Sequence, residues 1–126
     1  MKDLKILMCD DSLLVRKKLV NALKEQGFTQ LLEAADGEEA IQLCEAHNPD
    51  LVLLDIVMPK KDGLEALEEI KRIRPETHVV MVSSVGTQNN LIRAIKLGAE
   101  NFLQKPITVN DIISVAKKIK PERGAR

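Results

Sequence analysis

Short apolar segments and longer amphipathic segments alternate five times along the chain. The apolar segments are predicted as strands at 4–9, 30–34, 50–54, 79–82 and 101–104. The segments between them repeat apolar residues at helical spacing and are predicted as helices at 12–26, 38–47, 64–73, 87–97 and 108–119. Five strand–helix units in succession predict an α/β fold, with a parallel sheet between two layers of helices.

The same spacing predicts which face of a helix is buried, because residues three or four positions apart share a face. The expected buried residues are Val15, Leu19, Ala22 and Leu23 on the first helix, Ala40, Ile41 and Cys44 on the second, and Leu91, Ala94 and Ile95 on the fourth. The fifth helix carries Val109, Ile112, Ile113, Ala116 and Ile119 at helical spacing.

The length of 126 residues fits one domain, which we place at 1–120 with a polar tail at 121–126. The 19 basic and 19 acidic residues cancel, which argues against direct nucleic-acid binding, because phosphate contacts need a basic excess. No segment approaches the roughly 20 apolar residues of a membrane span, and no signal-peptide pattern is present. We therefore expect no membrane insertion, a cytoplasmic location, and reduced, buried thiols at Cys9 and Cys44.

Three acidic residues stand at the ends of two predicted strands: Asp10 and Asp11 follow the first, and Asp55 follows the third. Ligands of open parallel sheets bind at the carboxyl ends of the strands. Clustered carboxylates repel one another unless a cation joins them, and oxygen ligands suit Mg²⁺, or Mn²⁺ in its place. We predict a metal site with Asp11, Asp55 and the Val57 backbone carbonyl as ligands and Asp10 acting through a water. The alternative for Asp10 and Asp11 is that they cap the following helix.

Polar residues also end the fourth and fifth strands. Ser83 offers a hydroxyl donor and Lys105 a cation. With a metal, they would stabilise the oxygens of a phosphoryl group in transfer, and Asp55 would be the nucleophile that forms an aspartyl-phosphate. Ser83 could instead cap the next helix, and Lys105 alone could be a solvated surface lysine.

Taken in order, these motifs resemble the receiver domains of two-component response regulators. The resemblance covers about residues 4–119 and implies a flavodoxin-like (βα)5 doubly wound open parallel sheet. The strand order 2-1-3-4-5 is taken from known proteins of that fold and places strands 1 and 3 side by side. The motifs are Asp10-Asp11, Asp55, Met58-Pro59, Asp62-Gly63, Ser83-Ser84, Gly98-Ala99 and Lys105-Pro106.

The resemblance also implies a role for each residue. Asp55 is expected to be the phosphoacceptor, which receives phosphate from a histidine kinase or a phosphotransfer protein in a reaction that the domain itself catalyses. Ser83 resembles the switch hydroxyl, and Lys105 resembles the lysine that bonds the phosphate, with a typically cis bond to Pro106. Phe102 occupies the position of the aromatic residue that turns inward when Ser83 moves.

The segments 83–86 and 98–102 are similar to those of the single-domain chemotaxis type. That type implies a protein target, such as the flagellar motor, bound by the fourth helix, fifth strand and fifth helix. Ile92 and Val115 lie off the expected buried stripes of their helices and could form this face with Phe102, which is itself expected to pack against the sheet. A monomer is expected, and dimerisation on phosphorylation stays open. The alternative is a receiver cut from a longer regulator. Ile107 departs from the pattern, because Phe commonly follows Lys-Pro in this family.

An apolar patch is also expected near the site, since the first helix begins with two leucines. Leu13, Leu14, Pro106 and Ile107 could contact the helical phosphotransfer module of a kinase. Scattered surface apolar residues are the alternative.

Three other functions remain open from the sequence. A phosphatase or mutase with an aspartate nucleophile would carry a second acid where this chain has Val57. A dinucleotide-binding module would carry G-x-G-x-x-G where residues 10–12 read Asp-Asp-Ser. An interaction module that is never phosphorylated would lack an acid or the lysine of the site.

The side chains of Val57 and Val85 cannot orient an attacking water, so we predict slow loss of phosphate from Asp55.

Overall fold

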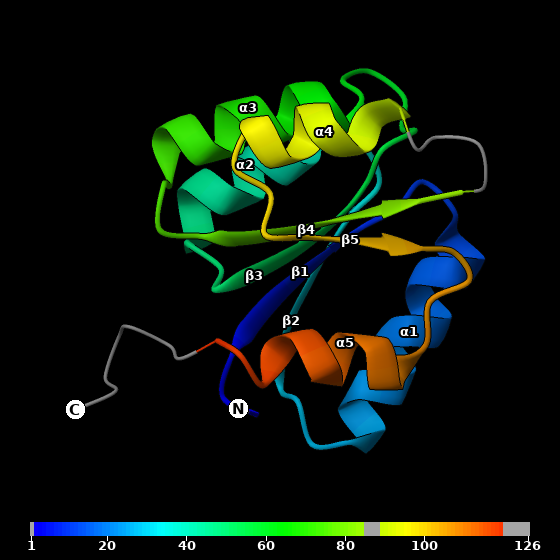
Figure 1. Ribbon diagram of the computed structural model, residues 1–126. Helices are drawn as coiled ribbons and strands as arrows, with labels where there is room; N and C mark the ends of the chain where they lie inside the picture. Colours follow the sequence, from blue (N-terminus) through cyan, green and yellow to red (C-terminus); the bar gives the residue numbers. More distant parts are fainter. Residues whose placement is uncertain (1, 85–88, 120–126) are drawn as a thin grey trace.

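The computed structural model describes residues 2–84 and 89–119, where five strands alternate with five helices (Figure 1). The predicted strands agree with the observed ones to within one residue at each end. The predicted start of the fourth helix, Val85 and the tail at 121–126 lie outside the described residues. The elements are β1 (Lys5–Cys9), α1 (Leu13–Glu25), β2 (Gln30–Ala34), α2 (Gly37–His47), β3 (Leu51–Asp55), α3 (Gly63–Ile73), β4 (His78–Ser83), α4 (Asn89–Lys96), β5 (Asn101–Gln104) and α5 (Val109–Ala116).

The strands form one parallel sheet in the order β2-β1-β3-β4-β5, which confirms the predicted flavodoxin-like topology. All five residues of β3 are buried, because this strand is central and helices cover both of its faces. β1 pairs with β3 so that Cys9 lies opposite Leu54. The residues that follow these two positions are therefore brought to one edge of the sheet.

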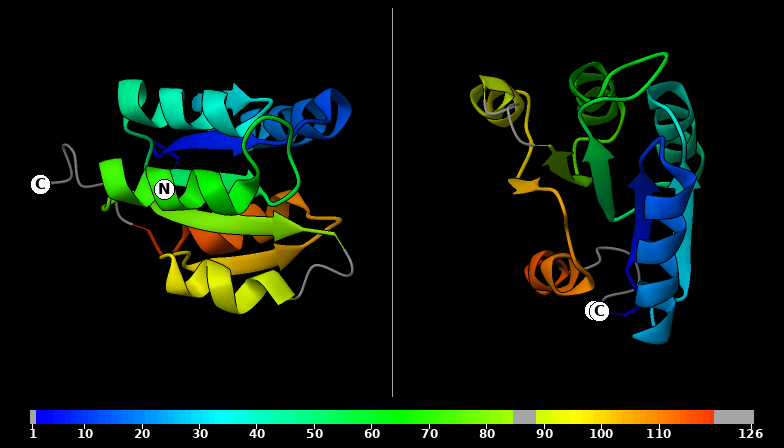
Figure 2. Two further views of the ribbon diagram at one scale, coloured as in Figure 1. Left: turned by 90° about the horizontal axis from the view of Figure 1, so that it is seen from above. Right: turned by 90° about the vertical axis from the view of Figure 1, so that its right-hand side faces the viewer.

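Two apolar cores lie on opposite faces of the sheet (Figures 1 and 2). Helices α2, α3 and α4 cover one face, and α1 and α5 cover the other. Cys9 and Cys44 belong to the first core and are both buried free thiols. In the described part of the chain, no helix combines the length and the apolar character needed to cross a membrane.

The prediction of which face of α4 is buried is wrong in part. Ala94 is buried, but Leu91 is 36% exposed and Ile95 is 57% exposed. Figure 1 places α4 towards the β5 side of the sheet, so only a narrow stripe of the helix meets the core. The prediction that Ile92 is exposed is confirmed, because its side chain is 66% exposed.

Two more expectations of burial are corrected. Val15, in the first turn of α1, is exposed, because it borders an open cleft rather than the packed core. Val115 is buried, because α5 packs through Ile112, Val115 and Ala116, which recur at helical spacing. Val115 therefore cannot belong to an exposed output face.

Candidate metal and phosphoryl site

The carboxyl ends of β1 and β3 bring the three acidic residues together. Asp55 is the last residue of β3, and Asp10 directly follows β1. Asp10 and Asp55 are buried, whereas Asp11 is exposed. One carboxylate oxygen of each lies within 4.8 Å of the others. The sequence prediction that Asp10, Asp11 and Asp55 converge is therefore met by the geometry.

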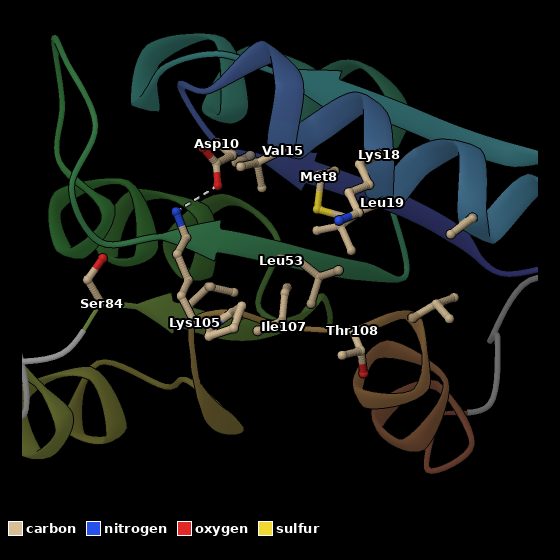
Figure 3. Close-up of a pocket in the computed structure, with 15 residues that line it drawn as sticks. Met8, Asp10, Val15, Lys18, Leu19, Leu53, Ser84, Lys105, Ile107 and Thr108 are labelled. Atoms are coloured by element: carbon tan, nitrogen blue, oxygen red, sulfur yellow. Dashed lines mark ion pairs between the residues drawn. The ribbon is translucent and has the colours of Figure 1, made fainter.

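Lys105 joins two of these carboxylates. Its Nζ lies 2.7 Å from Asp55 Oδ2 and 2.9 Å from Asp10 Oδ2, and Figure 3 shows the side chain turned towards Asp10. The backbone fixes the residue, because the Lys105 N–H donates to the Ser83 carbonyl at 2.7 Å. The peptide bond between Lys105 and Pro106 is cis, as the resemblance implied.

The donor set fits a divalent cation. All three side chains offer oxygen, which is the ligand type that Mg²⁺ and similar hard cations prefer. Three carboxylates against one lysine leave an excess of two negative charges, which a divalent ion would neutralise. The exposure of Asp11 leaves the open side of the cluster accessible from solvent.

Backbone groups hold the two buried carboxylates in place. The Ser12 N–H donates to Asp10 Oδ1 at 2.8 Å, and the Val57 N–H donates to Asp55 Oδ1 at 3.3 Å. Arg16 Nη1 donates to the Asp10 carbonyl at 2.7 Å. Sequence reasoning missed Arg16; the only signal was a basic residue in the second turn of the helix that follows Asp10.

Burial and ion pairing shift the pKa values of Asp55 and Lys105 in opposite directions. Burial raises the pKa of Asp55 above its usual value, and the hydrogen bond and charge of Lys105 recover only part of that shift. Burial alone would lower the pKa of Lys105, but the hydrogen bonds that Lys105 donates to Asp55 and Asp10, together with the charges of these carboxylates, outweigh it and the pKa is raised. Lys105 therefore remains a cation, while the charged form of Asp55 carries a net cost of desolvation.

The loop between β3 and α3 folds back on Asp55. The Gly63 N–H donates to the Ile56 carbonyl at 2.7 Å. Asp62 caps α3: its side chain accepts from the Glu65 N–H at 2.9 Å, and the Glu65 side chain accepts from the Asp62 N–H at 3.2 Å. A Cβ atom on Gly63 would lie 2.2 Å from the Asp55 carbonyl oxygen, so only glycine allows this approach.

A second glycine clamps the other side of the same loop. Gly37, the first residue of α2, lies so close to the loop that an added Cβ would stand 2.2 Å from the Lys61 carbonyl oxygen. The loop is thus held against β3 at one end and against α2 at the other.

The other predicted site residues occupy the same edge or lie further away. Ser83 is buried at the end of β4, the strand beside β3. Val57 is 65% exposed just beyond Asp55. Phe102 lies half-buried on β5 against the first core, with β4 between it and Asp55. The roles given to Val57, Ser83 and Phe102 stay predictions.

Known proteins resemble this chain over nearly its whole length. The family model for the response regulator receiver domain matches residues 6–117. The chemotaxis protein CheY of Bacillus subtilis (strain 168) is 37% identical over 114 residues, which cover 90% of this chain and 95% of that protein.

Two further similar proteins show that such domains occur both within longer regulators and alone. The transcriptional regulatory protein PdtaR of Mycobacterium tuberculosis (strain ATCC 25618 / H37Rv) is 39% identical over 111 residues, but these cover 86% of this chain and 53% of that protein. The crystal structure of a CheY-like response regulator receiver domain protein from Methanospirillum hungatei JF-1 superposes with a TM-score of 0.86 at 26% identity, covering 92% of each chain.

Proposed function

Since this chain belongs to the response regulator receiver family, we propose that Asp55 accepts a phosphoryl group from the phosphohistidine of a histidine kinase or phosphotransfer protein. Receiver domains are phosphoacceptors and not conventional enzymes, and histidine kinases phosphorylate them. The observation that carries the proposal is the Lys105 ammonium held between the buried carboxylates of Asp55 and Asp10. It places a cation and a nucleophile side by side.

In the proposed reaction, an oxygen of the Asp55 carboxylate attacks phosphorus, and the bond from phosphorus to the donor nitrogen breaks. Lys105 exchanges its contact with the free carboxylate for a contact with a phosphoryl oxygen. A divalent cation held by Asp10, Asp11 and Asp55, with the Val57 carbonyl, would offset the charge of the phosphoryl oxygens. The buried position of Ser83 supports its role as a hydroxyl donor to the same group, and Phe102 would respond from β5.

The similar proteins bear on whether this domain acts on a separate protein target or on a domain of the same chain. Identity to CheY over 95% of that protein supports a chemotaxis role with a separate protein target. The match to half of PdtaR supports the alternative, a receiver domain at 1–120 within a longer regulator. A full-length transcript that ends near residue 126 would favour the first.

One experiment tests phosphorylation directly. Incubation with Mg²⁺ and acetyl phosphate should add one phosphoryl group to the intact mass, in an adduct that is stable in acid and labile in base. Asp55→Asn should abolish it, whereas Asp50→Asn, directly before β3 and at the opposite end of that strand from Asp55, should not. The absence of an adduct in the parent chain would leave an interaction module that is never phosphorylated.

A further inference from the structure

The side chain of Arg16 connects β2 to the backbone between two of the acidic residues. It is only 12% exposed and bonds through two of its nitrogens. Nη1 donates to the Asp10 carbonyl at 2.7 Å, and Nε donates to Glu33 Oε1 at 2.9 Å. The planar guanidinium holds these donors in a fixed relative position, which the single nitrogen of a lysine cannot reproduce. Arg16 therefore ties the Asp10 carbonyl to the side chain of Glu33.

The backbone of Asp10 is held from β2 on both sides. The Asp10 N–H donates to the Ala34 carbonyl at 3.1 Å. The preceding residue of β2, Glu33, acts through Arg16 on the carbonyl of Asp10. That carbonyl belongs to the planar peptide group that joins Asp10 to Asp11, so a bond to its oxygen also fixes the position of Asp11 Cα.

The carboxylate of Asp11 depends on this backbone more than the other two carboxylates do. Asp10 and Asp55 are buried, and each is held by the Lys105 ammonium and by a backbone N–H. Asp11 is exposed, and in the described part of the chain no hydrogen bond or ion pair holds its side chain. The direction of this carboxylate is therefore set by its backbone and by the cation that it binds.

We propose that Arg16, held by Glu33, is a positioning residue that orients Asp11 towards the divalent cation. This inference rests on the proposed function, because Asp11 serves there only as a ligand of that cation. Arg16 is itself a cation beside the site, and the Glu33 carboxylate at 2.9 Å offsets its charge. Arg16 thus supplies a hydrogen bond to the backbone without the full repulsion that an unpaired guanidinium would exert on a metal ion.

Charge and positioning predict opposite results for Arg16→Met. Removal of a positive charge beside three carboxylates should, by electrostatics alone, tighten the binding of Mg²⁺. Loss of the bond to the Asp10 carbonyl should instead weaken it by about tenfold, the lower end of the effect of removing a group that orients a metal ligand. Arg16→Lys keeps the charge but has one nitrogen for two acceptors, so we expect a loss of about fivefold.

Calorimetric titration of the folded, unphosphorylated chain with Mg²⁺ measures these affinities. Lys17→Met removes the other cation that pairs with Glu33, at 2.8 Å, and should bind Mg²⁺ within about twofold of the parent. Arg74→Met is the control for a general loss of stability. Arg74 also donates to two backbone carbonyls, those of Cys44 and Glu45, but at the end of α2 away from the site. Its affinity should likewise stay within about twofold of the parent.

Equal or tighter Mg²⁺ binding in Arg16→Met, an equal loss in Arg74→Met, or no Mg²⁺ binding by the parent would overturn the proposal. If Arg16→Met does not fold, as judged by circular dichroism, unchanged affinity in Arg16→Lys would overturn it alone.

Phosphorylation gives a second measurement. At saturating Mg²⁺, Arg16→Met should react with acetyl phosphate within about threefold of the parent rate, because Arg16 bonds to Asp10 and Glu33 rather than to Asp55 or Lys105. A rate that stays low would also overturn the assignment. The Mg²⁺ titrations use no phosphoryl donor, so if the parent forms no adduct the proposed function fails, while the affinities still decide the role of Arg16.

Discussion

Lys105→Met should raise the excess negative charge of the acidic site from two to three, and so make the stability of the folded chain more dependent on a bound cation. In the parent chain, the ammonium lies 2.7 Å and 2.9 Å from two carboxylates that are 6% and 7% exposed. At an effective dielectric constant of about 20, each contact is worth about 6 kcal/mol before desolvation. Most of this attraction offsets the burial of the charges, so the measurable loss is smaller.

Removing one partner of a buried ion pair costs about 3–5 kcal/mol. Lys105 itself is 26% exposed, and water reaching it screens the pair, so we expect the lower end, about 3 kcal/mol. Because the chain has neither Trp nor Tyr, urea unfolding is best followed by far-ultraviolet circular dichroism. Lys117→Met, an exposed lysine beyond α5, is the matched control and should stay within about 0.5 kcal/mol of the parent.

The loss of stability in Lys105→Met should increase as the pH rises. Without the lysine, the pKa of Asp55 rises further above its unfolded value of about 4. An acid with a raised folded pKa holds its proton longer in the folded chain, so stability falls as pH rises from about 4 through the folded pKa. Lys105→Met should therefore nearly match the parent at pH 4.5 and differ fully at pH 8.

At pH 8, Mg²⁺ should restore part of the stability that Lys105→Met loses. A concentration ten times the dissociation constant stabilises by about 1.4 kcal/mol, and the variant, with one more negative charge in the site, should bind the ion more tightly than the parent. An equal loss at pH 4.5 and pH 8, or a smaller Mg²⁺ effect in the variant than in the parent, would refute the electrostatic reasoning.

Three further changes probe the site. Gly63→Ala should destabilise by about 2–3 kcal/mol, because the new Cβ meets the Asp55 carbonyl and Ile56 Cα, which are backbone atoms that cannot swing away; a loss below 1 kcal/mol in urea unfolding would contradict this. Asp55→Asn should raise the thermal midpoint at pH 7 without Mg²⁺, because burial raises the pKa of Asp55 and the amide avoids the cost of the charge; the gain should shrink towards pH 4, and a lower midpoint at pH 7 would count against it. Val57→Asn should speed loss of phosphate from Asp55, because its exposed side chain can then orient a water; unchanged or slower loss by intact mass would sink the idea.

The strands and the acidic cluster could be predicted because strong local patterns encode them. Strands as apolar as β1 and β3 can only be buried, and the residues that end them must meet at one edge once the strands are neighbours. The position of Lys105 at this edge follows from the same logic at the end of β5, whereas its ion pair with Asp55 was not predicted.

The predictions of burial that failed concern side chains whose surroundings depend on how a helix is placed against the sheet. Whether Leu91 and Ile95 are buried depends on how far α4 reaches over the sheet, and whether Val115 is buried depends on the roll of α5. Neither is set by the periodicity of one helix. The cleft between α1 and α5 could not be predicted either, because its walls are apolar residues that read as ordinary core positions.

The two glycines that clamp the loop after β3 also determine where this domain can vary. Positions 37 and 63 have no space for any side chain, so substitutions there would be eliminated whatever their effect on phosphate chemistry. Val57, Pro59 and Lys60, on the same loop, are exposed and meet no such barrier. A random library selected for altered phosphate lifetime should therefore recover its changes at these three exposed positions, while the loop keeps its shape.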